Sequence, residues 1–207
     1  MTSGRFITFE GPDGSGKSTQ LALLAARLRA QGREVVETAE PGGTSIGRDI
    51  REILLNAKNH HLRPTAELLL YFASRAQNVE EVILPALERG AIVLSDRFTD
   101  STLVYQGVGR GLGPDVVRRL HTIACGTLMP HLTLLVDISP ELTFERTTQR
   151  AAQDRLDAES LDFHRRVREG YRQLAVAEPG RVRVVDGAHT VEEVSLALWP
   201  LVEAALA

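Results

Sequence analysis

The residues with the clearest chemical meaning lie near the start of the chain. Residues 11–18 read GPDGSGKS and match the phosphate-binding pattern G-x-x-x-x-G-K-[ST]. The glycines let consecutive backbone N–H groups point inward, which forms an anion-binding nest at the N-terminus of a helix. In such a nest Lys17 reaches the β- and γ-phosphates of ATP, and the Ser18 hydroxyl binds Mg²⁺. The predicted ATP-binding residues of this segment are Gly11, Pro12, Asp13, Gly14, Ser15, Gly16, Lys17, Ser18 and Thr19.

A second candidate site is the pair Asp96-Arg97, which directly follows the apolar run Ile92–Ser95. An Asp at the carboxyl end of a strand beside the phosphate loop is placed to hold Mg²⁺ through a water, although the same residue can simply cap a helix. Arg97 indicates an anionic acceptor held in line with the γ-phosphate. A transferase that joins two phosphate-bearing substrates has more charge to neutralise than an enzyme that hydrolyses ATP.

A third candidate is the charged segment Gln149–Glu159, which reads QRAAQDRLDAE. Charged stretches of this kind are often only solvated loops. Next to a phosphate site, the segment can instead act as a lid over about residues 148–160, with Arg150 and Arg155 closing on the phosphates as arginine fingers. Arginines in that role contribute about 10³–10⁵ in rate.

Short apolar runs that alternate with helical patterns must position these groups. The runs lack polar alternation, as do strands buried on both faces of a parallel sheet. The predicted strands are Phe6–Phe9, Val35–Thr38, Ile92–Ser95, Leu132–Ile138 and Val182–Val185. The alternation predicts an α/β fold with a five-stranded parallel sheet and helices on both faces.

The helical patterns make their own predictions. One buried face is expected from Leu21, Leu24, Ala25 and Leu28, and a second from Ile46, Ile50, Ile53 and Leu54. Residues 190–193 read TVEE and predict a capping box that opens the last helix.

The composition is that of a soluble globular protein of one domain, which we expect to span residues 1–207. A net charge of −3 gives no reason to expect nucleic-acid or membrane partners, and no apolar run reaches the roughly 18 residues of a membrane helix. Only Lys17 and Lys58 are lysines, so 22 of the 24 basic residues are arginines, which suit phosphate binding. The single Cys125 and the absence of a signal-peptide pattern favour the cytoplasm.

A phosphate loop does not name a function, because switches, motors and kinases share it. A GTP-binding switch normally reads guanine with an N/T-K-x-D segment. Lys58 is the only lysine outside the phosphate loop, and His60 stands where that segment needs Asp. A nucleotide-binding switch is therefore disfavoured, and a phosphotransferase is the better hypothesis.

Five motifs together resemble the thymidylate kinase family over nearly the whole chain. They are GPDGSGKST at 11–19, EPGGT at 40–44, YFASRAQ at 71–77, DRFTDSTLVYQG at 96–107 and RLD at 155–157. The resemblance implies a P-loop NTPase fold with an arginine-bearing lid. It also implies transfer of the γ-phosphoryl group of Mg-ATP to dTMP, giving dTDP and ADP for dTTP biosynthesis. Another nucleoside or nucleoside-monophosphate kinase of the same fold is the alternative.

The resemblance also implies roles for individual residues. Asp13 is expected to contact the deoxyribose 3′-hydroxyl, Arg97 to grip the acceptor phosphate with Arg51, and Arg75 to donate to a pyrimidine carbonyl. Either Tyr71, which is preferred, or Phe72 is expected to stack on the base. The implied dTMP-binding residues are Asp13, Arg51, Tyr71, Phe72, Arg75, Arg97, Ser101, Tyr105 and Gln106.

The nucleotide side of the site is implied in the same way. Arg146 is expected near the adenine. Some family members carry an arginine where this chain has Gly14, so the lid is expected to supply the catalytic arginines here. The implied catalytic residues are Asp13, Lys17, Arg97, Arg150 and Arg155.

Family resemblance further implies a homodimer packed through helices. Residues 66–73 read AELLLYFA and are apolar on more than one helix face. Such a helix is buried on several sides, either within its own domain or against a partner. The sequence leaves both explanations open.

Overall fold

The computed structural model describes residues 4–148, 155–156 and 159–207. Within these residues, five strands form one parallel sheet in the order β2-β3-β1-β4-β5. The predicted five-stranded parallel sheet is confirmed, and each strand lies where a short apolar run predicted it. The strands are β1 (Arg5–Glu10), β2 (Val35–Ala39), β3 (Ile92–Asp96), β4 (Leu132–Asp137) and β5 (Val182–Asp186).

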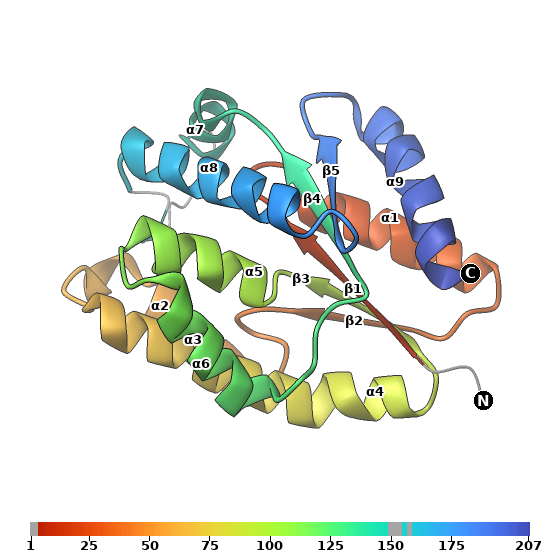
Figure 1. Cartoon of the computed structure of the whole chain (residues 1–207), viewed down its shortest axis with the longest axis horizontal. Coiled ribbons are helices and arrows are strands. Elements are labelled where there is room, and N and C mark those ends of the chain that lie inside the picture. Colours follow the sequence, from red (N-terminus) through yellow and green to blue (C-terminus); the bar gives the residue numbers. More distant parts are fainter. Residues whose placement is uncertain (1–3, 149–154, 157–158) are drawn as a thin grey trace.

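Helices connect the strands and cover both faces of the sheet (Figure 1). The α-helices are α1 (Lys17–Ala30), α2 (Ser45–Leu55), α3 (Pro64–Asn78), α4 (Leu84–Glu88), α5 (Thr99–Thr102), α6 (Pro114–Cys125), α7 (Pro140–Thr148), α8 (Leu161–Ala177) and α9 (Val191–Leu206). Two π-helical segments, η2 (Val79–Ile83) and η3 (Leu103–Gly109), extend α3 and α5, and η1 (Ala57–Asn59) is a 3₁₀ turn.

Alternate residues of the central strand build the two halves of the core. Ile7 and Phe9 pack on one face with α1 and α9, whereas Phe6 packs on the other with η2 and α4. This alternation follows from the two-residue period of a strand. All three side chains are fully buried, so β1 is covered on both sides.

Two of the three helix predictions are confirmed. The face of α1 that carries Leu21 and Leu28 is buried, and Thr190 opens α9 with a capping box. The third predicted helix is present as α2, but its apolar face is only partly covered: Leu54 is buried, whereas Ile46 and Ile53 are 51% and 46% exposed. The reason is that α2 packs on α3 along one side and leaves its outer side uncovered.

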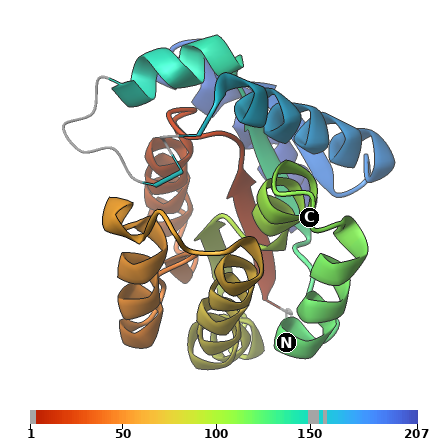
Figure 2. The ribbon, with the colours of Figure 1, turned by 90° about the vertical axis from the view of Figure 1, so that its left-hand side faces the viewer.

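The parallel topology brings three of the predicted motifs to one edge of the sheet. Because all strands run the same way, the segments after β1, β2 and β3 emerge side by side at the carboxyl edge of the sheet, which Figure 2 faces. These segments are the phosphate loop, residues 40–44 and Asp96-Arg97. No helix in the described part of the chain is long and apolar enough to cross a membrane.

Candidate active site

The phosphate loop is held in its curved path by its glycines. Gly11 has a φ of +131°, and a Cβ atom there would lie 2.3 Å from the carbonyl oxygen of Val136. Gly16, with a φ of +93°, precedes the first turn of α1. Only glycine combines these backbone angles with so close an approach. The loop therefore presents its N–H groups at the start of α1, as an anion-binding nest requires.

Lys17 is buried at the base of this loop, and its Nζ donates to the carbonyl oxygen of Pro12 at 2.7 Å. Burial, together with the nearby Arg97, lowers the pKa of Lys17 from its usual 10.5 to about 8. A phosphate group bound in the loop would replace the carbonyl as the partner of this ammonium group and favour its charged form.

Ser18 and Asp96 form the candidate metal site. The Ser18 hydroxyl donates to Oδ2 of Asp96 at 2.5 Å, which joins the first turn of α1 to the end of β3. A hydroxyl and a carboxylate oxygen at the mouth of a phosphate nest are the donors that Mg²⁺ takes when it is also bound to nucleotide phosphates. The two residues therefore fit the metal that the phosphate loop implies.

Two adjoining cavities open at this edge of the sheet. The larger is an open groove along the phosphate loop, β2 and residues 40–43, and the smaller is a recess between α2, α3 and η3. Five residues line both of them: Asp13, Glu40, Pro41, Arg51 and Arg97. A group bound in the groove and a group bound in the recess would meet at these shared walls.

Arg97 lies at the centre of the shared wall. Its Nη2 donates to Oδ1 of Asp13 at 2.9 Å, and its Nη1 donates to the hydroxyl of Ser101 at 2.9 Å. Its backbone has a φ of +71°, which is uncommon for any residue but glycine and points to a constrained functional position. The carbonyl oxygen of Phe9 accepts from the Arg97 N–H at 2.9 Å and holds the turn.

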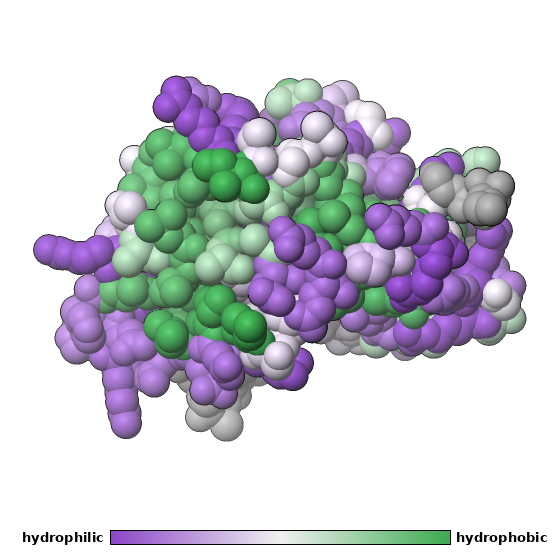
Figure 3. Space-filling view, turned by 90° about the horizontal axis from the view of Figure 1, so that it is seen from below, coloured by the Kyte–Doolittle hydropathy of each residue, from purple (hydrophilic) through white to green (hydrophobic). Residues whose placement is uncertain are grey.

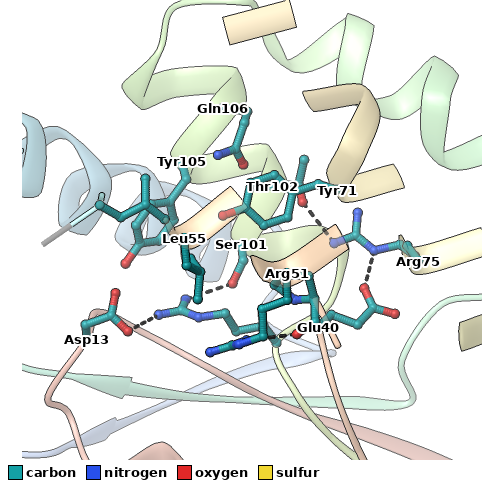
Figure 4. Close-up of a pocket in the computed structure, with 13 residues that line it drawn as sticks. Asp13, Glu40, Arg51, Leu55, Tyr71, Arg75, Ser101, Thr102, Tyr105 and Gln106 are labelled. Atoms are coloured by element: carbon teal, nitrogen blue, oxygen red, sulfur yellow. Dashed lines mark hydrogen bonds and ion pairs between the residues drawn. The ribbon is translucent and has the colours of Figure 1, made fainter. Parts of the chain in front are cut away.

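The recess is lined by most of the residues expected to read the acceptor (Figure 4). Arg75 is fully buried, where it forms an ion pair with Glu40 and donates to Thr102 at 2.9 Å. Its Nη1 has no hydrogen-bond partner within the described residues. Because a buried unpaired N–H is costly, this donor suits a polar group of a ligand.

The structure separates the two aromatic candidates. Tyr71 lines the recess, whereas Phe72 packs with Leu68 and Val117 in a separate apolar cluster. Arg51, Tyr105 and the other predicted residues of the recess do line it. The structure therefore places Tyr71, and not Phe72, in the wall of the recess.

Two predicted site residues, one for ATP and one for dTMP, have further contacts. Arg146, on α7, donates to the carbonyl oxygen of Gly14 at 2.9 Å and so braces the phosphate loop. Arg51, on α2, donates to the carbonyl oxygen of Pro41 at 2.8 Å. Gly11, Pro12 and Ser15 shape the loop from behind and do not line the groove.

The structure does not bring Arg155 to the phosphates. Its Nε donates to the carbonyl oxygen of Leu54 at 2.9 Å, and its Nη2 lies 2.6 Å from Oε2 of the buried Glu67. It thus covers the carboxyl end of α2, where a cation is favourable. The predicted partner in the lid, Arg150, lies outside the described residues.

Sequence reasoning missed two buried carboxylates. Glu10 ends β1 and accepts from the backbone N–H of Phe98 at 2.8 Å, and Glu40 pairs with Arg75. Burial, followed by the nearby Asp100 carboxylate, raises the pKa of Glu10 from 4.5 to about 7. Burial also raises the pKa of Glu40. Glu10 directly precedes the phosphate loop and Glu40 is the first residue of EPGGT, and these positions were the available signal.

Comparison with known proteins identifies the family of this chain. The thymidylate kinase family profile matches residues 9–197. The chain is 50% identical to the thymidylate kinase of Deinococcus radiodurans over 98% of both chains, and 52% identical to that of Geobacter sp. over 98% of this chain and 91% of the relative. The crystal structure of thymidylate kinase from Ehrlichia chaffeensis superposes with a TM-score of 0.79 at 32% identity, covering 97% of this chain and 99% of that one. With the family profile spanning most of its length and relatives of this similarity, the chain belongs to the thymidylate kinase family.

Proposed function

We propose that this chain transfers the γ-phosphoryl group of ATP to dTMP and produces ADP and dTDP, a step in nucleotide biosynthesis. The observation that carries the proposal is the shared wall of the two cavities. A groove at a phosphate loop suits ATP, and a recess with a buried arginine suits a pyrimidine nucleotide. The reacting phosphates then meet beside Asp13, Arg51 and Arg97. Family membership supports dTMP as the acceptor.

The donor half of the site supplies positioning and charge, and no covalent intermediate is needed. The loop N–H groups hold the ATP phosphates, and Lys17 leaves the Pro12 carbonyl to reach the β- and γ-phosphates. Ser18 and Asp96 hold Mg²⁺, which neutralises developing phosphate charge when bound. Arg146, which donates to the carbonyl oxygen of Gly14, contacts the nucleotide at its adenine end in this proposal.

The acceptor half orients dTMP for in-line attack. Arg97 and Arg51 bind its phosphate, and the free N–H of Arg75 donates to a carbonyl of the base. Tyr71 stacks on the ring, and Asp13 contacts the 3′-hydroxyl. The recess is completed by Ser101, Tyr105 and Gln106. The ion pair with Asp13 already holds the Arg97 side chain at the boundary of the two cavities. Arg97 can therefore bind the acceptor phosphate there with little movement.

The proposal includes a homodimer in the cytoplasm. Three neighbouring helices each carry exposed apolar residues seven apart, which places them on one face of the helix. The pairs are Ile46 and Ile53 on α2, Ala66 and Ala73 on α3, and Val116 and Ile123 on α6. Figure 3 shows a broad apolar area on the side of the molecule that these helices occupy. An area of this kind suits a second copy of the chain.

A coupled assay of ADP release over a panel of nucleoside monophosphates tests the proposed function. We expect dTMP to far outperform AMP, GMP and CMP, because the pyrimidine carbonyl edge is what Arg75 can read. Turnover of AMP equal to that of dTMP would contradict the thymidylate assignment, and would favour another nucleoside-monophosphate kinase of this fold. Binding of ATP without any phosphoryl transfer would instead favour a nucleotide-binding switch.

A further inference from the structure

Glu10 is a fully buried carboxylate at the end of β1, one residue before the phosphate loop. It makes no ion pair within the described residues. Instead, it accepts four hydrogen bonds. The donors are the backbone N–H groups of Phe98 and Ser101, at 2.8 and 3.2 Å, the hydroxyl of Tyr171 at 2.8 Å, and the hydroxyl of Ser101. A buried charge held only by neutral donors is costly, so its retention calls for a functional reason.

The two hydroxyl groups that donate to Glu10, those of Ser101 and Tyr171, are also hydrogen-bond partners of Arg97. Nη1 of Arg97 lies 2.9 Å from the Ser101 oxygen and 3.3 Å from the Tyr171 oxygen. A hydroxyl has one proton to donate. An ionised Glu10 takes both protons at its Oε2, and the lone pairs of the two oxygens, which lie 2.9 Å apart, are then left to accept from Arg97. The charge of Glu10 therefore sets the polarity of the hydrogen bonds around this guanidinium group.

Glu10 also stabilises the backbone on which Arg97 stands. The backbone N–H groups of Phe98 and Ser101 donate to Glu10. Phe98 directly follows the left-handed turn at Arg97, and Ser101 lies in the first turn of the helix after it. With Asp13 on the opposite nitrogen of the guanidinium group, both the turn and the side chain are fixed before any substrate binds. Tyr171 comes from α8, so the arrangement ties this distant helix to the site.

We propose that Glu10 is a positioning residue for phosphoryl transfer: through Ser101 and Tyr171, it holds Arg97 in the orientation that receives the acceptor phosphate. This inference rests on the proposed function, because it assumes that Arg97 binds the phosphate of dTMP. Glu10 itself lies behind these partners and does not line either cavity.

The test compares Glu10→Gln with Thr8→Val at pH 8. Glutamine keeps the shape of Glu10 but places an NH₂ donor against the two hydroxyl groups, whose protons must then turn toward Arg97. We expect the KM for dTMP, and its Kd by calorimetry without ATP, to rise about tenfold or more, as for the loss of a charged hydrogen bond. The KM for ATP should stay within about twofold, since the phosphate loop is untouched.

Thr8→Val is the matched control. Thr8 is fully buried on the same strand, and its hydroxyl pairs with that of Thr133 at 2.9 Å rather than with Ser101 or Tyr171. It should lower the melting temperature without changing the KM for dTMP. Tyr171→Phe removes one partner and keeps the aromatic packing, so it should raise the KM for dTMP by a smaller factor. In the double variant, the rise in the KM for dTMP should be smaller than the product of the two single rises, because both changes act through Arg97.

Three results would overturn the inference. They are an unchanged Kd for dTMP in Glu10→Gln, an equal rise in the KM for ATP, and a similar rise in the KM for dTMP in Thr8→Val. If Glu10→Gln does not fold, the KM for dTMP of Tyr171→Phe decides, and a value equal to that of the wild type overturns the inference. Failure of the proposed function is distinct, because the wild-type chain would then not phosphorylate dTMP at all.

Discussion

Asp13 and Arg97 lie 84 residues apart in the chain, yet Oδ1 of one accepts from Nη2 of the other at 2.9 Å across the boundary between the two cavities. The carboxylate comes from the phosphate loop and the guanidinium group from the turn after β3. A carboxylate beside bound phosphates is repelled by them unless a cation or a hydroxyl compensates its charge. Arg97 supplies that compensation in the free protein, and it remains close to where an acceptor phosphate would bind.

The first prediction concerns the shape of this cation. In Arg97→Lys the charge remains, but one ammonium group cannot replace the fork that reaches Asp13 and Ser101 together. We expect kcat/KM for dTMP to fall about 100-fold, a loss of about 3 kcal/mol that is typical of a broken charge pair. Steady-state kinetics with each substrate varied should show little change in the KM for ATP. A variant that turns over dTMP as fast as the wild type would contradict the assigned role.

The second prediction separates the two arginines of residues 148–160. Arg150→Ala should lower kcat by about 10³ with little change in ATP affinity, as expected for charge stabilisation that develops in the transition state. Arg155→Ala should instead cost about 3 kcal/mol of unfolding free energy, because it weakens the charge balance of the buried Glu67. Urea unfolding and single-turnover rates of both variants would check this. A normal kcat in Arg150→Ala would rule out the lid arginine as a source of transition-state stabilisation.

Local patterns were enough to predict the sheet and the phosphate loop. Each strand is a short apolar run, and the loop glycines are required by backbone angles that no other residue tolerates, as at Gly11. Helix periodicity was less informative. It placed Ile46 and Leu54 on one apolar helix face. Only packing decides how much of that face meets the core, and Ile46 is exposed.

The buried polar groups of the site could not be predicted in this way. Glu10 acquires its role from Tyr171, 161 residues later, and from a turn that follows a neighbouring strand. Such contacts depend on strand order and helix placement, which a local pattern does not encode. The same holds for Arg155, whose residue type suited a phosphate but whose carbonyl and carboxylate partners lie on α2 and α3.

The third prediction concerns pH and stability. The pKa of Glu10 is raised from 4.5 to about 7 because burial and the Asp100 carboxylate outweigh Arg97 and the hydrogen bonds from Ser101 and Phe98. Between these pH values the folded protein keeps a proton that the unfolded chain has released. The contribution of Glu10 to the unfolding free energy therefore falls as pH rises through this window, by about 3 kcal/mol in total.

Urea unfolding of the wild type and Glu10→Gln at pH 4.5 and pH 8 measures this effect. The other titratable groups are common to both proteins, so the difference between the two isolates Glu10. The wild type should lose stability relative to the variant as pH rises. A difference that is the same at both pH values would show that the carboxyl group titrates normally.

The last prediction concerns the apolar face of α2, α3 and α6. Ile123, on α6, is 81% exposed in the single chain, and Leu69, on the neighbouring helix α3, is 52% exposed. Light scattering at micromolar concentration should give a mass of about twice 22.7 kDa for the wild type. Ile123→Glu should return the mass to that of one chain, because a charge buried in an apolar interface has no partner.

Val176→Glu is the matched control: Val176 is also 81% exposed but lies on α8, so the dimer should persist. A wild-type mass near 22.7 kDa would reject the dimer, and dissociation by both variants would show that the contact is not the face of α2, α3 and α6.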